Sequence, residues 1–302
     1  MMKQKSVFKV RNTELTILIL PALLYFLIFH YFPMYGLQIA FKEFNPFLGI
    51  AKSPWVGLEH FSRFFSSYHF WDIIKNTLGI SLYSLILGFP MPIILALMMN
   101  EMSSLRMKRI MQTVVYAPHF ISTVVMVGIL YIFLRPQNGL INRFIVMGGG
   151  ESVAFLTEAS MFKTIYVFSG IWQNTGWGTV IYLASLSAID PQIVEAAIID
   201  GASRWQRMMK INIPGILPMV IILFILNTGR IMNVGFEKVF LMQNPLNLRT
   251  SEIIATYVYR SGLQNYEYSF GSAVGFFNSV VNFLLLIFVN TIAKKTGESS
   301  LW

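Results

Sequence analysis

Long apolar runs separated by shorter polar segments dominate this sequence. Six of the runs carry no charged residue near their middle, and each is close to the roughly 20 residues that an α-helix needs to cross a bilayer. We therefore expect an all-α, polytopic membrane protein whose transmembrane domain covers residues 15–293. The expected spans are residues 15–35, 77–100, 111–134, 162–186, 213–232 and 271–293.

The first run follows a basic segment, Met1 to Glu14, and a secretory signal peptide begins in the same way. A signal peptide has a shorter apolar region that ends at a cleavage site of small residues, and residues 15–35 show neither feature. We expect this run to be retained as the first span. In the aromatic-rich loop 36–76, an amphipathic helix at the membrane interface is expected between Leu58 and Phe65.

The composition agrees with a membrane protein, because 55% hydrophobic and only 12% charged residues leave too few polar groups to cover a soluble globule. The formal charge of +9 does not indicate nucleic acid, since the basic residues form no continuous face. Segments 1–14, 101–110, 187–212 and 294–302 hold 12 Lys and Arg in 59 residues, against nine in the 106 residues of segments 36–76, 135–161 and 233–270. The positive-inside rule therefore places both termini and loop 187–212 in the cytoplasm.

Loop 187–212 carries the clearest local signals. Asp190 followed by Pro191 is typical of a helix N-terminus, and Gly201 suits the left-handed turn that ends a helix. Ser203 is placed to cap a second short helix. The pattern predicts two short helices joined at an elbow, which would project toward a soluble partner. Four apolar residues would contact that partner or pack the base of the elbow: Ile198, Ile199, Met208 and Met209.

The same stretch resembles the EAA motif of bacterial ABC-importer permeases. The matching residues are Glu195-Ala196-Ala197, Asp200-Gly201-Ala202, Ile211, Ile213-Pro214 and Pro218. Residues 30–46 and 233–246 are similar to segments of the carbohydrate-uptake branch for polysaccharide or lipoprotein transport, so the resemblance touches most of the chain. It implies a type I ABC-importer permease fold with six spans in the bacterial cell membrane. Arg204, Arg207 and Lys210 are not fixed by the motif and are interpreted as inner-leaflet anchors.

The resemblance also implies partners and roles. Glu195, Ala196, Ala197, Asp200 and Gly201 would form coupling helices that dock on an ATPase. The expected complex contains a second, homologous permease, two copies of an ABC ATPase and an extracytoplasmic solute-binding protein that delivers an oligosaccharide. ATP and Mg²⁺ would bind the partner ATPase, so this chain is expected to hold no cofactor, no metal and no catalytic residue.

Neutral polar and aromatic residues within the spans are candidates for a substrate path. Amides bond sugar hydroxyls, and aromatic rings stack on the apolar faces of sugars, so a path lined in this way suits a glycan with little or no charge. The candidates are Asn174, Trp177, Asn227, Asn278 and Asn282; Asn278 and Asn282, four positions apart, are expected to share a helix face. The same residue types also serve helix packing and interfacial anchoring, and that alternative stays open.

Two absences from the sequence bear on the energy source. It contains no GxxxxGK[ST] phosphate-binding motif, and no span has an acidic or basic residue near its middle. Energy is therefore expected from a separate ATPase. The alternative is an ion-coupled secondary carrier for a polar solute, which would need a coupling-ion site. A membrane-bound enzyme would need clustered His or carboxylate residues, whereas His30, His60, His69 and His119 are scattered.

Overall fold

The computed structural model describes residues 11–295 and residues 300 and 301. Within these residues the fold is helical, and extended pairing is limited to an isolated bridge between Lys42 and Trp55. This confirms the expected all-α class. Residues 1–10 of the expected N-terminal segment, and residues 296–299 and 302 of the expected C-terminal segment, lie outside the described residues.

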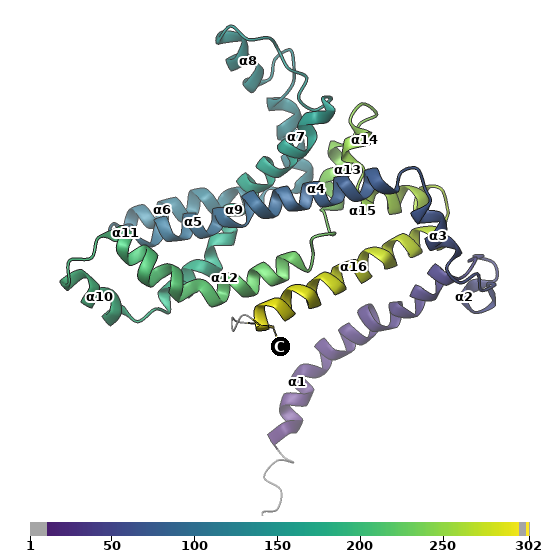
Figure 1. The fold of residues 1–302 in the computed structure, drawn as a ribbon, viewed down its shortest axis with the longest axis horizontal. Coiled ribbons are helices and arrows are strands. Elements are labelled where there is room, and N and C mark those ends of the chain that lie inside the picture. The colour runs from purple at the N-terminus through teal and green to yellow at the C-terminus, as the bar shows by residue number, and fades with distance from the viewer. Residues whose placement is uncertain (1–10, 296–299, 302) are drawn as a thin grey trace, which may run out of the picture.

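The first span is longer than expected and stands apart from the other helices. It consists of α1 (Arg11–Phe26), η1 (Leu27–Tyr31) and η2 (Phe32–Phe41), and its apolar helix runs over the 27 residues Leu15–Phe41. None of the residues in its most apolar window is buried. The last element of this span, η2, packs on the C-terminal helix α16 (Tyr268–Lys295). At the other end of the span, α1 diverges from the bundle (Figure 1).

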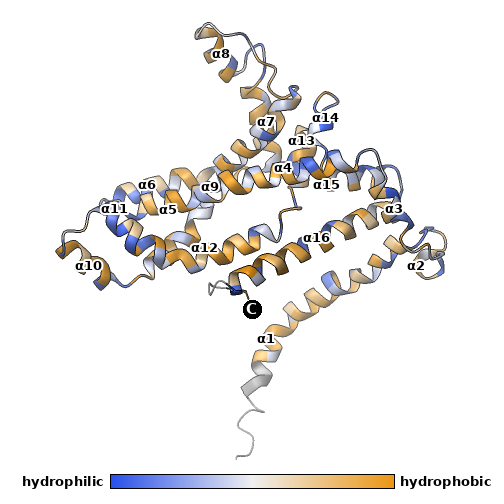
Figure 2. Ribbon diagram, viewed as in Figure 1, coloured by the Kyte–Doolittle hydropathy of each residue, from blue (hydrophilic) through white to orange (hydrophobic). Residues whose placement is uncertain are grey.

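Four further helices build the body. α4 (Phe70–Gly88) and α5 (Pro90–Asn100) form one helix of 31 residues, which packs along α9 (Phe162–Ser187). α12 (Ile213–Thr228) lies against both α9 and α16. Hydrophobic residues coat these helices, and hydrophilic residues gather toward the two ends of the bundle (Figure 2). This distribution is typical of a protein whose long axis crosses a bilayer.

Glycines allow two neighbouring helices to come close to α9. A Cβ atom on Gly176 would lie 1.8 Å from the carbonyl oxygen of Val115, and one on Gly178 would lie 2.8 Å from Cγ of Pro92. Neither position has room for a larger side chain without a shift of its neighbours. These two glycines are therefore sites of close helix approach.

The third expected span, residues 111–134, is not a straight helix. α6 (Leu105–Tyr116) continues into η3 (Ala117–Phe120), and α7 (Thr123–Phe133) then leaves at 97°. The break has a local cause: Pro118 lies in the final turn, and the Ser122 side chain accepts a hydrogen bond from the Val125 N–H and caps α7. A second bend, of 76°, separates α9 from α10 (Pro191–Ile199). Among the described residues, four helices are long and apolar enough to span a membrane, or six if each bent pair is one span.

Short helices close the end of the bundle that lies opposite α10 (Figure 1). The expected amphipathic helix is confirmed as α3, which buries Phe61 and Phe64. The short elements of the chain are α2 (Gly49–Lys52), α3 (Glu59–Phe65), α8 (Leu140–Met147), η4 (Ala159–Met161), α11 (Arg204–Arg207), η5 (Met208–Asn212), α13 (Phe236–Met242), α14 (Leu248–Ser251), α15 (Ile254–Val258) and η6 (Tyr259–Gln264).

Candidate functional site

The elbow begins and turns as the sequence predicts. The Asp190 side chain accepts a hydrogen bond from the Gln192 N–H at 2.9 Å, and Pro191 occupies the first position of α10. After α10 ends at Ile199, Gly201 adopts φ +77°, a conformation that glycine takes without steric penalty. A Cβ atom at Gly201 would meet nothing within 4 Å, so the backbone conformation, not lack of space, favours glycine here.

The second helix of the elbow differs from the expected one. Ser203 does cap α11, through a capping box in which Gln206 Oε1 accepts a hydrogen bond from the Ser203 N–H at 2.7 Å. However, α11, η5 and α12 form one continuous helix, Arg204–Thr228. Pro214 does not separate them because it stands in the first turn of α12, just after the wider π-helical turn η5, so the helix continues past it. The elbow thus consists of one free helix, α10, and the first turns of the next span, α11 and η5.

The exposed surface of the elbow is partly apolar. The side chains of Ile198, Ile199 and Trp205 are 54%, 85% and 66% exposed. Met209 is exposed as well, whereas Met208 packs into the core with Leu186, so the expected apolar residues divide between the surface and the base. Trp205 was not singled out from the sequence, although it lies within the motif, three residues after Ala202.

The motif residues lie on the accessible side of the elbow. Glu195, Ala196, Asp200 and Gly201 are exposed, and Ala197 is half-buried. Between α10 and α11 there is a crevice of about 350 Å³, lined by Ala197, Asp200, Gly201, Ala202, Gln206, Arg207, Lys210 and Ile211. The elbow therefore offers a partner an apolar ridge beside a polar crevice.

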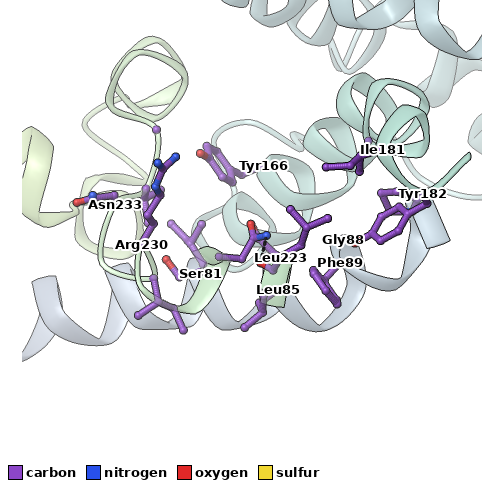
Figure 3. A pocket seen from close by; sticks show the side chains of 18 residues that line it. Ser81, Leu85, Gly88, Phe89, Tyr166, Ile181, Tyr182, Leu223, Arg230 and Asn233 are labelled. Carbon is purple, nitrogen blue, oxygen red and sulfur yellow. Dashed lines mark hydrogen bonds between the residues drawn. The ribbon is translucent and has the colours of Figure 1, made fainter. Parts of the chain in front are cut away.

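A second site lies inside the body. A cavity of about 550 Å³ is lined by α4, the start of α5, α9, α12 and residues 230–235 (Figure 3). Among the described residues, its lining contains no acidic residue. The polar side chains that line it are Ser81, Ser84, Tyr166, Tyr182, Asn227, Arg230 and Asn233.

Arg230 is the one charged side chain in this lining. It is exposed to the cavity and forms no ion pair with the described residues. In the sequence, Arg230 lies near the end of the expected span 213–232 and gives no local sign of facing a cavity. Its role in the cavity was missed, because only the fold brings Ser81 and Tyr166 to the same space.

Of the five expected path residues, Asn227 lines the cavity. Asn278 and Asn282 share a helix face, as expected, but both donate hydrogen bonds to Asn233 Oδ1, at 2.8 and 3.1 Å. Asn282 Oδ1 in turn accepts from the Met232 N–H at 3.0 Å. Asn278 and Asn282 therefore hold Asn233 in the cavity wall, and they are not among the residues that line the cavity.

Asn174 and Trp177 form a separate cluster with His119, outside the cavity lining. Asn174 Oδ1 lies 3.2 Å from His119 Nδ1, and the His119 ring stacks on the Trp177 ring with centroids 4.9 Å apart. This cluster joins η3 to α9 beside the 97° bend. These contacts support the alternative that the sequence left open, in which Asn174 and Trp177 serve helix packing.

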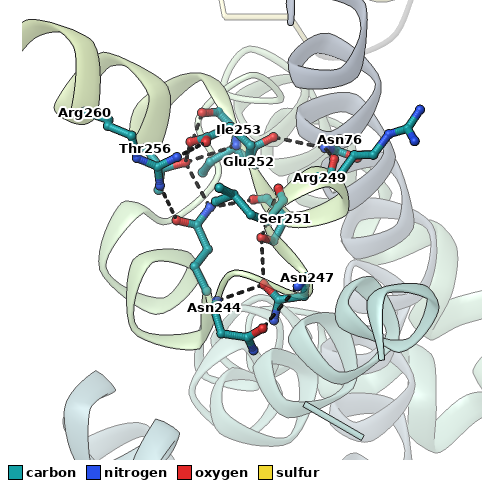
Figure 4. A network of polar contacts seen from close by, with 11 residues as sticks. Asn76, Asn244, Asn247, Arg249, Ser251, Glu252, Ile253, Thr256 and Arg260 are labelled. Atoms are coloured by element: carbon teal, nitrogen blue, oxygen red, sulfur yellow. Dashed lines mark hydrogen bonds and ion pairs between the residues drawn. The ribbon is translucent and has the colours of Figure 1, made fainter. Parts of the chain in front are cut away.

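A polar network anchors the segment between α12 and α16, which follows cavity residues 230–235 (Figure 4). Asn76 Nδ2, on α4, donates to the carbonyl oxygens of Arg249 at 2.8 Å and Glu252 at 3.2 Å. Arg260 forms an ion pair with Glu252, and Asn247, fully buried, donates to the Met242 carbonyl. The loop between α12 and α16 is thus a fixed part of the fold.

Comparison with known proteins identifies relatives of the whole chain. A family model described as binding-protein-dependent transport system inner membrane component matches residues 88–298. Protein LplB of Bacillus subtilis is 44% identical, covering 97% of this chain and 92% of LplB. The polygalacturonan/rhamnogalacturonan transport system permease protein YteP of the same organism is 42% identical over 97% of this chain and 91% of YteP.

Solved structures agree with these relatives. A chain of a bacterial alginate ABC transporter, in complex with an alginate pentasaccharide-bound periplasmic protein, superposes with a TM-score of 0.88 at 40% identity and covers 96% of this chain and 97% of that one. Because the family model spans more than half of the sequence and relatives above 40% identity cover nearly all of it, this chain belongs to the family of inner membrane components of binding-protein-dependent transport systems.

Proposed function

We propose that this chain is a permease subunit of an ATP-driven ABC importer and that the oligosaccharides it takes up are acidic. The observation that supports an acidic substrate is the cavity lining. Among the described residues, Arg230 is unpaired there and no carboxylate is present. An arginine without a partner attracts anions, and its planar guanidinium matches the two oxygens of a carboxylate.

The remaining lining suits a sugar. Ser81, Asn227 and Asn233 offer groups that bond hydroxyls, and Phe89 brings to the lining an aromatic ring of the kind on which a pyranose stacks. The names of the similar proteins support an acidic glycan, since YteP is a polygalacturonan/rhamnogalacturonan permease and one similar structure comes from an importer of the acidic polysaccharide alginate. The sequence-based expectation of little or no charge on the glycan is therefore replaced by an acidic one.

Energy comes from partner subunits. The chain works with a second permease, two ABC ATPase copies and an extracytoplasmic binding protein; ATP and Mg²⁺ bind the ATPases, and this chain performs no catalysis. We assign ATPase docking to the elbow: Ile198 and Ile199 provide apolar contact, and the exposed carboxylates of Glu195 and Asp200 form charge-assisted bonds. This assignment requires the elbow and both termini to be cytoplasmic, in agreement with the distribution of Lys and Arg.

The geometry suggests how the docked elbow acts on the cavity. α10 follows α9 after a 76° bend, and α9 contributes Tyr166, Gly178 and Tyr182 to the cavity lining. When two ATPases close, their motion displaces α10 and tilts α9 as a rigid body. The cavity then opens alternately to the two sides of the membrane.

Reconstituted proteoliposomes that contain the whole complex and its binding protein test this function. Uptake of a labelled uronic-acid oligosaccharide should require ATP at the ATPase side and should not follow from an ion gradient alone. Arg230→Gln should lower this uptake at least about tenfold, because a charge-assisted bond of about 1.5–3 kcal/mol is lost. Its effect on a carboxyl-reduced oligosaccharide of the same linkage should be less than about threefold, which serves as the matched control.

Two outcomes would contradict the proposal in different ways. Uptake driven by an ion gradient without ATP would exclude the importer and favour the secondary carrier. Equal uptake of the acidic oligosaccharide by the wild type and Arg230→Gln, with ATP required, would leave the importer intact and remove the acidic-substrate assignment.

A further inference from the structure

A partly buried ion pair fastens the elbow to a different helix of the body. Arg207 Nη2, on α11, lies 3.0 Å from Glu101 Oε2, and the two side chains are only 15% and 19% exposed. Glu101 directly follows α5 and lies 106 positions before Arg207 in the sequence. The other carboxylate oxygen, Oε1, accepts a hydrogen bond from Asn212 Nδ2 at 3.2 Å, and Asn212 is buried. Both oxygens of Glu101 are thus held by the helix Arg204–Thr228.

The guanidinium of Arg207 also reaches the turn of the elbow. Its Nη1 donates to the carbonyl oxygen of Ala202 at 2.9 Å, one residue beyond the left-handed Gly201. One side chain therefore joins three parts of the molecule: the turn, α11 and the end of α5. The sequence-based interpretation of Arg207 as an inner-leaflet anchor is wrong, since this residue faces the protein interior.

This arrangement differs energetically from the exposed ion pairs of the chain. Arg249 and Asp72, for example, are 3.7 Å apart with Arg249 82% exposed, and such pairs contribute little because water screens them. Around Glu101 and Arg207 water is largely excluded, and removal of one partner would leave the other charge uncompensated. The pair is therefore expected to persist while the elbow moves.

α5 leads from this ion pair to the cavity. Pro92 near the start of α5, and Phe89 just before it, line the cavity, whereas Glu101 follows its last residue. The chain itself connects the elbow to α9 and α12, and without the pair the turns near Asp190 and Gly201 would allow α10 to swivel relative to α5. With the pair, a displacement of the elbow must also move α5.

We propose that the contacts of Arg207 with Glu101 and Ala202 form a positioning link, which transmits movement of the elbow to the cavity wall through α5. This inference rests on the proposed docking of the ATPase on the elbow. Neither residue needs to touch ATP or substrate; both act by keeping the elbow, α11 and α5 in a fixed relation.

The experiment measures substrate imported per ATP hydrolysed, with the full complex and binding protein in proteoliposomes. Glu101→Gln and Arg207→Gln should each lower this ratio at least about fivefold, the lower end of common coupling effects, while the ATPase stays bound and active. Arg109→Gln is the matched control, because Arg109 is an exposed cation of α6 at the same end of the bundle and has no ion pair among the described residues. It should leave the ratio unchanged.

The charge-swapped double variant Glu101→Arg with Arg207→Glu separates a positioning role from simple loss of structure. It restores the ion pair, so its ratio should exceed that of either single variant, a recovery that independent effects would not give. Because this chain has no cysteine, the two positions can also be changed to Cys and joined by a short bifunctional thiol reagent in a complex whose other subunits lack accessible cysteines. The cross-linked complex should transport, and the uncross-linked one should be poorly coupled.

Three results would overturn the positioning link. These are an unchanged ratio in both single variants, a cross-linked complex that cannot transport, and dissociation of the ATPase in Glu101→Gln, which would make the pair part of the docking surface. Failure of the docking proposal is visible separately: Gly201→Trp, which obstructs the elbow without touching Glu101, would then retain the ATPase.

Discussion

Asn282 accepts a hydrogen bond from the backbone N–H of Met232 at 3.0 Å, across 50 positions of sequence. The same side chain donates to Asn233, whose own side chain lines the central cavity. Together with Asn278, this buried amide on α16 thus fixes the position of the segment after α12.

Replacing Asn282 with Ala should therefore weaken both the fold and the cavity. Loss of the amide leaves the Met232 N–H buried without this partner, at a cost of about 1–3 kcal/mol. Thermal unfolding of the purified complex should shift to lower temperature, and uptake should fall. Ser279→Ala is the matched control, because Ser279 is exposed and bonds only to Gly275 of its own helix. Equal melting temperatures for the two variants would refute this role of Asn282.

Gly201 should tolerate Asn better than Val. Both substitutions have space, since nothing lies within 4 Å of an added Cβ, but φ is +77°. Asn adopts this conformation with little penalty, whereas a β-branched residue costs about 1–2 kcal/mol or more. We expect Gly201→Val to reduce co-purification of the ATPase with the permease and Gly201→Asn to retain it. If both variants kept the ATPase equally, the turn at Gly201 would not matter for docking.

Gly176 should reject even a methyl group. Its Cβ would lie 1.8 Å from the Val115 carbonyl, so Gly176→Ala must separate α9 from α6, at a cost of about 1–3 kcal/mol for overpacking. Gly128→Ala is the control, because Gly128 is also helical but has open space, and there Ala should be neutral or slightly stabilising. The comparison is made by thermal unfolding in detergent. A Gly176→Ala variant as stable as Gly128→Ala would show that the helices separate without cost.

Lys238 should make the stability of the protein depend on pH in the alkaline range. It lies in α13, outside the candidate spans, and burial lowers its pKa from 10.5 to about 8. Between pH 8 and 10.5 the unfolded chain binds more protons at this lysine than the folded one, so stability rises with pH across that window. Below pH 8 both states are protonated, and the contribution is constant.

The effect of Lys238 is at most about 3 kcal/mol, from about 1.4 kcal/mol for each pH unit of the shift. Chemical unfolding of the wild type and Lys238→Met, at pH 8 and pH 10, measures it. Between these two pH values the free energy of unfolding should rise more in the wild type than in the variant. The same slope in both proteins would mean that the ammonium group is not the source.

Much of the fold was predictable because its signals are local. Hydropathy locates the membrane helices, and Asp190, Gly201 and Ser203 determine the elbow through caps and a left-handed turn. The length of the first span was underestimated, because the helix continues through Phe41, beyond the purely apolar run. The 97° bend was not foreseen from Pro118 alone, since a proline within an apolar run is as consistent with a mild kink.

The candidate cavity was less predictable because its members are distant in sequence. Arg230 alone has the appearance of a span-end cation, and only its position beside α4 and α9 makes it part of a cavity. Likewise, Asn278 and Asn282 carry the residue type expected of a sugar contact, but both donate to Asn233, and it is Asn233 that lines the cavity. Glu101 and Arg207 give no local signal of their pairing. Long-range contacts decide each of these roles.

The first helix, whose most apolar part is not buried in the body, has a consequence for the lipid that surrounds the protein. At about 1.5 Å per residue, the 27 residues of Leu15–Phe41 measure about 40 Å, while a bilayer's hydrocarbon interior is about 30 Å thick. Since none of its most apolar window is packed against the body, the inclination of this helix follows acyl-chain length and neighbouring subunits. The tilt of this helix from the bilayer normal should therefore be largest in thin membranes and smallest in thick ones.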